Sequence, residues 1–406
     1  MIRVHVTPII FDPFRSTFTV SGRAFTTVSH DGTFRRLRYT PTAPQARRHL
    51  STTRTTMSNT MKALVFSGKG QPTLQDRPQP TILKSSDAVV KMVKTTICGT
   101  DLHILKGDVA TCETGRILGH EGIAVVQSVG DGVTRFKPGD NVIVSCITSC
   151  SSCEYCRKGM PSHCVEGGWI LGNTIDGTQA EYVRIPYADG SLHPMVKGAT
   201  ADEQVMVSDV LPTGFECGVL NGRVSPGKSV AIVGGGPVGL GAMLTAQLYS
   251  PSHIIMIDLD ANRLEMAKTL GATHGVVSGK GTDVVGAVKA LTDGKGVDTV
   301  IEAVGVPATF ELCQEIVAPG GTIANLGVHG CKVDLHLEDL WHKNITITTR
   351  LVDASTSPML IKLVDSGKLK TTGLVTHTYK FSEMTEAYNT FGAAAKNNAL
   401  KVIINF

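Results

Sequence analysis

The sequence of 406 residues lacks any apolar run long enough to span a bilayer, and it shows no secretory signal. A membrane-spanning helix needs about 20 consecutive apolar residues, so we expect no membrane as a partner. Hydrophobic residues make up 42% of the chain and charged residues 18%, which is ordinary for a globular protein. The length predicts at least two domains.

The chain also lacks a strong charge once its first sixty residues are set aside. Those residues contain nine Arg and two Asp, with no Lys and no Glu, so they carry a charge of +7. The whole chain carries +4, which leaves −3 on the remainder. A mildly acidic body argues against nucleic acid as a partner.

Residues 1–60 have no clear period and are rich in Thr, Ser and Arg. An Arg-rich, Ser-rich and acid-poor composition is typical of an organellar transit peptide. We therefore expect residues 1–56 to be cleaved and the protein to lie in the mitochondrial matrix. The alternative is that translation begins at Met57 or Met61, which would leave the protein in the cytoplasm.

Residues 61–210 have little helical periodicity. Short β-type runs dominate this segment, and Gly and Pro separate them, which predicts a compact β-rich domain whose loops carry function. The chain ends with an apolar strand pattern at residues 401–406, which we expect to return to this domain. The predicted strands of the segment cover residues 63–66, 88–93, 123–129, 141–144 and 180–185.

Four of the ten cysteines lie close together in this segment, at Cys150, Cys153, Cys156 and Cys164. Four thiolates at such spacing can close a tetrahedral shell around zinc, and a closed four-sulfur shell is structural. Disulfides and an iron–sulfur cluster are the alternatives. No secretory signal or redox-partner motif accompanies the cysteines, so we predict a structural zinc site. Cys146, just before them, is expected to pack in the core.

A second set of metal-binding residues lies outside this cluster. Cys98 follows a β-type run, and His120 comes about twenty residues later. A thiolate and a neutral imidazole suit zinc, and catalytic zinc takes three protein ligands and one open position. We predict Asp209 as the third ligand. Taken singly, Cys98 and His120 also fit a buried free cysteine and a core histidine.

From residue 211 the pattern changes to alternating strands and helices. A buried run at residues 229–233 enters the motif G-x-G-x-x-G, and a helical stretch and a second strand follow. Such glycines allow a tight turn and close approach to a pyrophosphate, and an acid after the second strand accepts hydrogen bonds from the ribose. The predicted cofactor-binding residues are therefore Gly234, Gly236, Gly239 and Asp258.

The acid after the second strand also bears on which nicotinamide cofactor binds. Asp258 would repel a ribose 2′-phosphate, and Asp260 adds charge of the same sign. No Arg or Lys directly follows Asp258; Arg263, five residues on, is expected at the cofactor site. We therefore expect NAD rather than NADP.

Zinc with an open position beside a nicotinamide-binding fold implies hydride transfer to or from a carbonyl. With these motifs together, residues 61–406 resemble the zinc-dependent alcohol dehydrogenases of the medium-chain family, and most of all the microbial tetrameric type. The resemblance implies an α/β protein with a GroES-like β-rich catalytic domain at residues 61–210 and 346–406. It also implies a doubly wound Rossmann domain at residues 211–345. The protein is expected to form a homo-oligomer, and the resemblance implies a tetramer.

The resemblance implies roles for the metal-site residues. Cys98 and His120 match the first two ligands of the catalytic zinc, and Asp209, with three residues between it and a Thr-Gly pair, falls where the third ligand is found. Cys217 is a rival thiol beyond that pair. Glu121 matches the acid beside the metal, which can act as an alternate ligand.

Further roles follow from the same resemblance. Thr100 matches the hydroxyl of a proton relay, and His103 matches its outer member. Lys401 matches a basic residue that contacts the pyrophosphate. At Gly99, several relatives carry a basic residue instead, so we expect this chain to hold NADH less tightly.

The implied reaction is the reversible oxidation of primary or secondary alcohols to aldehydes or ketones, by hydride transfer from a zinc-bound alkoxide to NAD. Each subunit would hold two zinc ions. The rival functions are a formaldehyde or hydroxymethyl-adduct dehydrogenase and a polyol dehydrogenase, although polyol relatives usually lack the Asp209 pattern. A zinc-free binding protein would lack Cys98 and His120. Trp169 is expected either at the substrate pocket or in the core.

Overall fold

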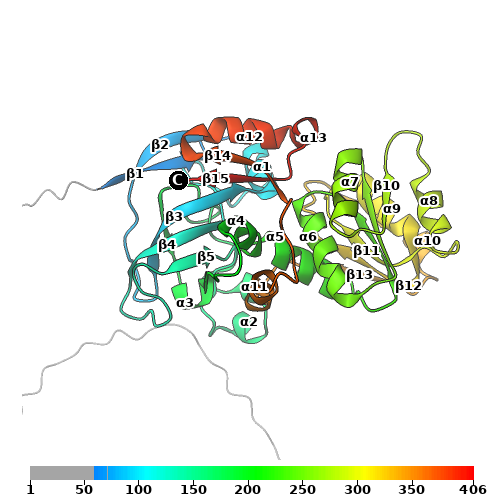
Figure 1. The fold of residues 1–406 in the computed structure, drawn as a ribbon, viewed down its shortest axis with the longest axis horizontal. Coiled ribbons are helices and arrows are strands. Elements are labelled where there is room, and N and C mark those ends of the chain that lie inside the picture. Colours follow the sequence, from blue (N-terminus) through cyan, green and yellow to red (C-terminus); the bar gives the residue numbers. More distant parts are fainter. Residues whose placement is uncertain (1–58, 71) are drawn as a thin grey trace, which may run out of the picture. The chain divides into compact units, whose positions relative to one another are not determined.

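The structure is a computed structural model that describes residues 59–70 and 72–406 (Figure 1). The transit peptide expected at residues 1–56 lies outside the described residues. Three sheets organise the described chain, with two, seven and six strands. None of the helices in this part of the chain combines the length and the apolar character needed to cross a membrane.

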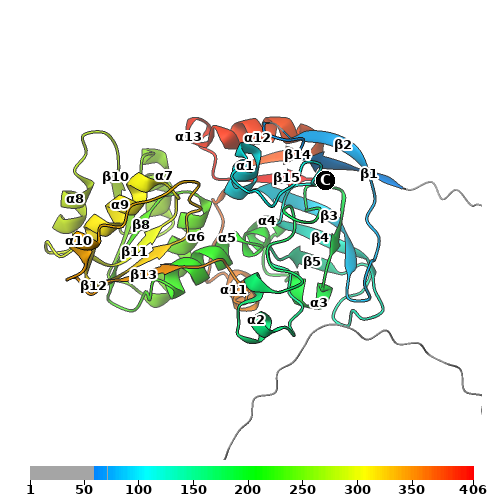
Figure 2. The same cartoon turned by 180° about the vertical axis from the view of Figure 1, so that it is seen from behind.

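The seven-stranded sheet forms the centre of the β-rich domain. Its strands lie in the order β14-β15-β3-β4-β5-β7, and β6 pairs with β3. The final strand pairs antiparallel with β3, so the expected return of the C-terminal strand is confirmed. Figures 1 and 2 show α12 lying along β14 and β15. The strands of this sheet and of the separate β1-β2 hairpin are β1 (Thr60–Val65), β2 (Thr73–Pro78), β3 (Ala88–Ile97), β4 (Gly122–Val129), β5 (Asn141–Val144), β6 (Tyr182–Ile185), β7 (Leu192–Pro194), β14 (Val375–Lys380) and β15 (Lys401–Asn405).

The β-rich domain contains more helix than the sequence pattern predicted. α1 (Gly99–Lys106) begins directly after β3, and Cys98 is its N-cap. The segment that leads into the Rossmann domain is also helical, and it includes a π-helix, η3 (Thr213–Leu220). The other helices outside the Rossmann sheet are α2 (Glu154–Arg157), α3 (Ala188–Ser191), α4 (Ala201–Gln204), α5 (Val210–Pro212), α11 (Ser357–Asp365), α12 (Met384–Gly392) and α13 (Ala394–Asn397), with 3-10 turns η1 (Pro161–His163), η2 (Val205–Val207) and η5 (Phe381–Glu383).

The six-stranded sheet is parallel throughout, in the order β10-β9-β8-β11-β12-β13. Counted along the chain this is 3-2-1-4-5-6, the order of a doubly wound dinucleotide-binding sheet. The predicted Rossmann fold is therefore confirmed. Its elements are β8 (Ser229–Val233), α6 (Pro237–Ala246), η4 (Gln247–Tyr249), β9 (His253–Asp258), α7 (Ala261–Thr269), β10 (His274–Val277), α8 (Val284–Ala290), β11 (Val297–Glu302), α9 (Pro307–Ile316), β12 (Val317–Asn325), α10 (Leu337–Leu340) and β13 (Thr346–Thr349).

Both faces of this sheet are covered, and β8 shows how. Every residue of β8 is buried, as expected for a central parallel strand. Val230 and Ile232 pack in one core with α6 and α7. Ala231 and Val233 pack in another core with α8 and α9. Successive side chains of a strand point to opposite faces, so one continuous apolar run serves two helical layers.

The structure corrects one domain boundary. β13 pairs with β12 in parallel, from Thr322 opposite Thr346 to Asn325 opposite Thr349. The expected boundary at residue 345 therefore falls before the last strand of the Rossmann sheet. A short strand rich in Thr gives little periodicity, which is why the sequence pattern did not assign it.

Strand β7 supports a prediction about stability at low pH. His193 is buried there, and burial, with the charge of Arg135, lowers its pKa from 6.5 to about 4. Below pH 6.5 the unfolded chain binds the proton more readily, so the free energy of unfolding falls as the pH drops from 6.5 to about 4. The full loss is roughly 3 kcal/mol.

Urea unfolding between pH 4 and pH 7 tests this dependence. A His193→Gln variant keeps a polar side chain that does not titrate, so its free energy of unfolding should fall less over this range. Equal losses in the two proteins would show that other groups cause the acid sensitivity.

Candidate metal and cofactor site

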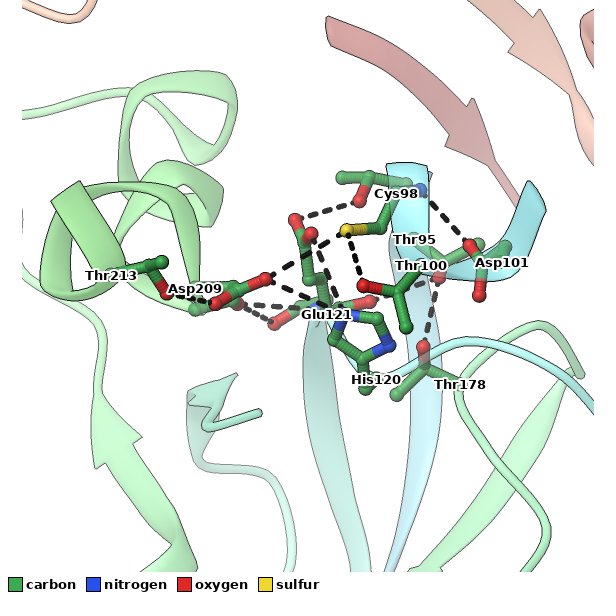
Figure 3. Close-up of polar contacts among 12 residues, drawn as sticks. Thr95, Cys98, Thr100, Asp101, His120, Glu121, Thr178, Asp209 and Thr213 are labelled. Atoms are coloured by element: carbon green, nitrogen blue, oxygen red, sulfur yellow. Dashed lines mark hydrogen bonds and ion pairs between the residues drawn. The ribbon is translucent and has the colours of Figure 1, made fainter. Parts of the chain in front are cut away.

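Four side chains with metal-binding atoms meet at one point of the β-rich domain (Figure 3). Ligand atoms of Cys98, His120, Glu121 and Asp209 all lie within 4.8 Å of one another. The Asp209 Oδ2 atom is 3.4 Å from His120 Nε2 and 3.9 Å from Cys98 Sγ. The structure thus brings together the three predicted ligands and the predicted neighbouring acid.

Strand pairing places the first ligands side by side. β3 and β4 are antiparallel, with Thr95 opposite Gly122. Cys98 follows the end of β3, while His120 and Glu121 precede the start of β4. The two segments therefore reach the same end of the sheet.

A serine that the sequence analysis missed brings in the third ligand. Ser208 Oγ accepts a hydrogen bond from the Gly122 N–H at 3.2 Å and contacts the Gly122 carbonyl oxygen at 3.3 Å. The Ser208 carbonyl oxygen accepts from the Cys146 N–H at 3.0 Å. These bonds fix the following residue, Asp209, beside the start of β4. Thr213 Oγ1 donates to Asp209 Oδ1 and orients the carboxylate.

Asp101 is a second residue that sequence reasoning missed. It is fully buried, and its Oδ2 atom accepts from the Cys98 N–H at 2.9 Å and from Gln179 Nε2 at 3.1 Å. Burial raises the pKa of this carboxyl. An acid three residues after a helix N-cap is a capping signal that could have identified it. Its role is to hold the backbone from which the Cys98 thiol projects.

The charges of the site fit a divalent cation. Burial alone would lower the pKa of His120, but Asp209 and Cys98 outweigh it and raise that pKa well above its ordinary value. Burial would raise the pKa of Asp209, yet the hydrogen bond and charge of His120 lower it. These carboxylate and thiol groups therefore attract positive charge to their centre. Sulfur, imidazole and carboxylate together, with three ligands and a neighbouring acid, suit catalytic zinc.

Lys401, expected to contact the pyrophosphate, has a partner in the metal site that the sequence did not indicate. Its side chain is 2% exposed, and its Nζ atom lies 2.6 Å from Glu121 Oε1. Burial would lower the pKa of Lys401, but Glu121 and Cys98 raise it, so the ammonium stays charged. β15 lies between β14 and β3, so Lys401, its first residue, is brought next to Glu121 of the metal site. Thr96 Oγ1 donates to the other Glu121 oxygen at 2.8 Å, so Glu121 is held from both sides.

The two expected relay residues lie on α1. Thr100 Oγ1 is 3.6 Å from Cys98 Sγ, which places the hydroxyl next to the metal site. His103 is one turn further along the helix, and its side chain is about one quarter exposed. Residues three apart lie on the same side of a helix. No hydrogen bond joins Thr100 to His103 within the described residues, so a proton relay between them requires an intervening group.

The four-cysteine cluster forms as predicted, with the ligand atoms of Cys150, Cys153, Cys156 and Cys164 within 4.8 Å of one another. Backbone N–H groups already point at the sulfurs: Cys153 N–H donates to Cys150 Sγ, and Cys150 N–H to Cys164 Sγ, both at 3.4 Å. Partial burial opposes ionisation of Cys150, but donors from Ser152 and Cys153 lower its pKa to about 6. Burial instead raises the pKa of Cys164 to about 12, so a zinc ion would find four sulfurs already in place and would displace the remaining thiol protons as it binds.

The glycine loop after β8 fits a pyrophosphate. Gly236 caps α6 without a side chain, and a Cβ atom built there would meet no atom within 4 Å. A Cβ atom at Gly239 would instead lie 1.9 Å from the carbonyl oxygen of Gly234, so only glycine allows the loop to close on the helix. The open backbone at the N-terminus of a ten-residue helix is suited to a negatively charged group.

Asp258 lies at the end of β9 and is tied to this loop. Its Oδ2 atom accepts from the Gly235 N–H at 2.6 Å, and its Oδ1 atom accepts from the Asp260 N–H at 2.8 Å. Arg263 Nη1 is 3.8 Å from Asp258 Oδ2. The structure therefore places the predicted acid and Arg263 together, next to the predicted phosphate loop.

The structure also places Trp169, Cys146 and Cys217, whose positions the sequence had left undecided or only expected. The Trp169 ring stands edge-on to the His120 ring at 6.2 Å between centroids, which puts this tryptophan beside the metal site. Cys146 and Cys217 are buried together in an apolar cluster that Trp169 borders. Cys217 is not among the grouped metal-binding residues.

Comparison with known proteins agrees with this arrangement. Residues 84–197 match the family model of the alcohol dehydrogenase GroES-like domain, and residues 237–366 match that of the zinc-binding dehydrogenases. An alcohol dehydrogenase of Cupriavidus necator is 36% identical over 371 residues, which covers 86% of this chain and 99% of that protein. The chain therefore belongs to the zinc-dependent medium-chain alcohol dehydrogenases.

Two further relatives support the assignment. The structure of zinc-dependent alcohol dehydrogenase 2 from Streptococcus pneumoniae is similar with a TM-score of 0.82 and 52% identity, over 85% of this chain and 98% of that one. Zinc-type alcohol dehydrogenase B of Aspergillus flavus is 34% identical over 85% of this chain and 82% of that protein. The relatives thus cover the described domains almost completely.

Proposed function

We propose that the protein oxidises simple primary or secondary alcohols, reversibly, with NAD as the hydride acceptor. The observation that carries this proposal is the cluster of Cys98, His120 and Asp209 in a chain that also has a phosphate-binding glycine loop. We propose two zinc ions per subunit, one at this cluster and one at the four cysteines. The zinc-dependent relatives named above support the same assignment.

Residues around the metal site have separate roles in the proposed reaction. Zinc, when bound, would act as a Lewis acid that lowers the pKa of an alcohol. Thr100 is placed next to the metal-binding atoms, so its hydroxyl can take the alcohol proton and pass it outward. The Lys401–Glu121 pair lies behind the ligands and fixes the acid beside them. Trp169 borders the site and would exclude water from the reacting carbon.

We propose NAD rather than NADP because the carboxylate of Asp258 lies where a ribose 2′-phosphate would approach. Arg263, 3.8 Å away, is paired with that carboxylate, which leaves less positive charge for a phosphate. Relatives of both kinds exist: one solved relative was crystallised with NADH and another with NADP.

The test is NADH formation by the purified protein across short primary alcohols, secondary alcohols, polyols and formaldehyde, with NADP in parallel. Turnover of simple alcohols with NAD supports the proposal. The polyol arm matters because sorbitol dehydrogenase of Bacillus subtilis is 30% identical to this chain. Turnover of polyols or formaldehyde alone, or turnover only with NADP, would replace the proposed substrate or cofactor.

Gly99 provides a prediction about product release. A Cβ atom at Gly99 would meet no atom within 4 Å, so a longer side chain fits there. Gly99→Arg adds a cation for the pyrophosphate, and we expect NADH dissociation about tenfold slower. Stopped-flow NADH fluorescence measures this rate, with Gly99→Gln as the uncharged control. Equal NADH dissociation rates for the Arg and Gln variants would show that the added cation does not contact the pyrophosphate.

We also propose that the protein assembles as a homo-oligomer, with a tetramer expected from the resemblance. β13 is the last strand of its sheet, and near it Trp341 and Leu337 are 77% and 59% exposed. Covering such apolar surface and an unpaired strand edge with a second copy would be favourable. Analytical ultracentrifugation gives the assembly, and a monomer at micromolar concentration would remove the proposal.

We propose that the protein lies in the mitochondrial matrix, with the cytoplasm as the alternative. The bacterial relatives have no mitochondria, which supports the cytoplasmic alternative. The composition of residues 1–56 supports the mitochondrial matrix. Import into isolated mitochondria with cleavage near residue 56 would decide for the matrix, and no import would decide for the cytoplasm.

A further inference from the structure

His103 has a partner that neither the sequence pattern nor the proposed relay includes. Its Nδ1 atom lies 2.9 Å from Asp108 Oδ2. The two side chains are 25% and 34% exposed, so both are partly shielded from solvent. No other hydrogen bond or ion pair involves the side chain of either residue within the described part of the chain.

The end of α1 builds this pair. Gly107 adopts a left-handed conformation with φ of 89° and closes the helix, its N–H pointing to the carbonyl oxygens of His103 and Ile104. The N–H of the next residue, Asp108, also donates to the His103 carbonyl oxygen, at 3.0 Å. The reversed chain brings a carboxylate back over the histidine five residues earlier. The contact is thus fixed by backbone geometry and not by a chance encounter of two long side chains.

The chemistry of the pair sets the state of the imidazole. An ionised carboxylate can only accept hydrogen bonds, so the Nδ1 atom of His103 must carry the hydrogen. In the neutral ring the Nε2 atom then has the free lone pair. An acceptor at Nε2 is what the outer member of a proton relay requires.

The pair also lies next to the end of the Rossmann sheet where ligands bind. A Cβ atom built at Gly330 would be 3.6 Å from the Asp108 carboxylate. Gly330 is in the loop that follows β12, and in doubly wound sheets ligands bind at the carboxyl ends of the strands. His103 is therefore oriented at the border between the metal-site helix and the predicted cofactor site.

We propose that Asp108 is a positioning residue for proton transfer: it holds His103 as the Nδ1–H tautomer, so that Nε2 accepts the proton that leaves through Thr100. This inference rests on the proposed function. The proton passes from the alcohol through Thr100 and the intervening group to His103 Nε2 and then to solvent, while NAD, the oxidant of the proposed function, accepts the hydride. Asp108 itself keeps its charge throughout.

The kinetic test compares five variants with the wild type in alcohol oxidation with NAD. Asp108→Ala is expected to lower kcat on the order of tenfold with little change in KM, because the imidazole is no longer oriented. Asp108→Glu should recover most of the loss, since it restores an acceptor. Adding Asp108→Ala to His103→Gln should lower kcat no further than His103→Gln alone, because both act on one group. Asp131→Ala, an exposed acid in another loop, is the matched control and should leave kcat unchanged.

Independent losses that multiply in the double variant would overturn the inference, as would an Asp108→Glu protein no better than Asp108→Ala. A second readout needs no activity. The ¹⁵N shifts of His103 in the full-length protein, assigned with His103→Gln, should show the Nδ1–H tautomer and change to Nε2–H in Asp108→Ala. A wild type with the Nε2–H tautomer would also overturn it. Failure of the proposed function appears differently, as a wild type that oxidises no alcohol whatever the tautomer.

Discussion

His120→Ala is expected to lower alcohol oxidation by at least a thousandfold, on the order expected when a Lewis acid that supplies several kcal/mol is lost. His120 contributes one of the three predicted ligand atoms, and Cys98 and Asp209 contribute the other two. The two ligands that remain in the variant would hold zinc poorly. The fold should persist, because β3 and β4 pair through their backbones and the removed ring is replaced by a smaller side chain. Steady-state NADH formation, zinc content and the melting temperature measure the three effects.

The matched control is His342→Ala, an exposed histidine far along the chain, which should keep full activity and both zinc ions. The zinc content of His120→Ala should fall from two ions per chain to one, because the four-cysteine cluster is untouched. A His120→Ala protein that oxidises alcohols at the wild-type rate would refute the assignment of the catalytic metal site.

Cys153→Ala is expected to have the second largest effect, on stability. Removing one of four thiolates should release the structural zinc, and loss of a bound metal is one of the few single changes that cost about 4 kcal/mol or more. Release of the zinc should also weaken contacts outside the cysteine cluster. Ser162, between the third and fourth cysteines, donates through its N–H and hydroxyl to Asp353 Oδ1 at 3.0 and 2.6 Å.

Asp353 is nearly completely buried, so the loss of Ser162 would leave a buried carboxylate with fewer donors. Guanidinium unfolding and zinc content of Cys153→Ala and of Cys331→Ala make the comparison, since Cys331 is exposed and outside both metal-binding groups. A Cys153→Ala protein with wild-type stability and two zinc ions would show that the cluster does not bind metal.

The parts of the molecule that sequence predicted well depend on short-range spacing. The four cysteines span fifteen residues, and their loop alone determines that the sulfurs meet. The glycine motif is similar, because Gly239 is required by a backbone contact with Gly234 in the same turn. Asp209 was predicted from the Thr-Gly pair that follows it, and its Thr213 does bond to the carboxylate.

The parts that sequence could not predict depend on tertiary contacts. The partner of Lys401 is set by the position of β15 between β14 and β3, which no local pattern gives. The pairing of His103 with Asp108 depends on one left-handed residue at the end of a helix that was itself not predicted. That helix begins Gly-Thr-Asp, and glycine and short polar side chains have low intrinsic helix propensity. Its start is fixed instead by the Cys98 N-cap and the buried Asp101.

The position of β15 also affects the order in which the two domains can fold during synthesis. This strand follows all the others in sequence, yet it lies inside the seven-stranded sheet, between β14 and β3, and carries the lysine that holds Glu121. Chains are synthesised from the N-terminus, and domains fold as their residues emerge. All strands of the Rossmann sheet leave the ribosome before β15 does, whereas β3, which ends just before Cys98 of the metal site, lacks its β15 neighbour until then. The catalytic metal site is therefore completed only after every strand of the Rossmann sheet has been synthesised, so its metal is loaded into a protein whose nucleotide-binding domain is already able to fold.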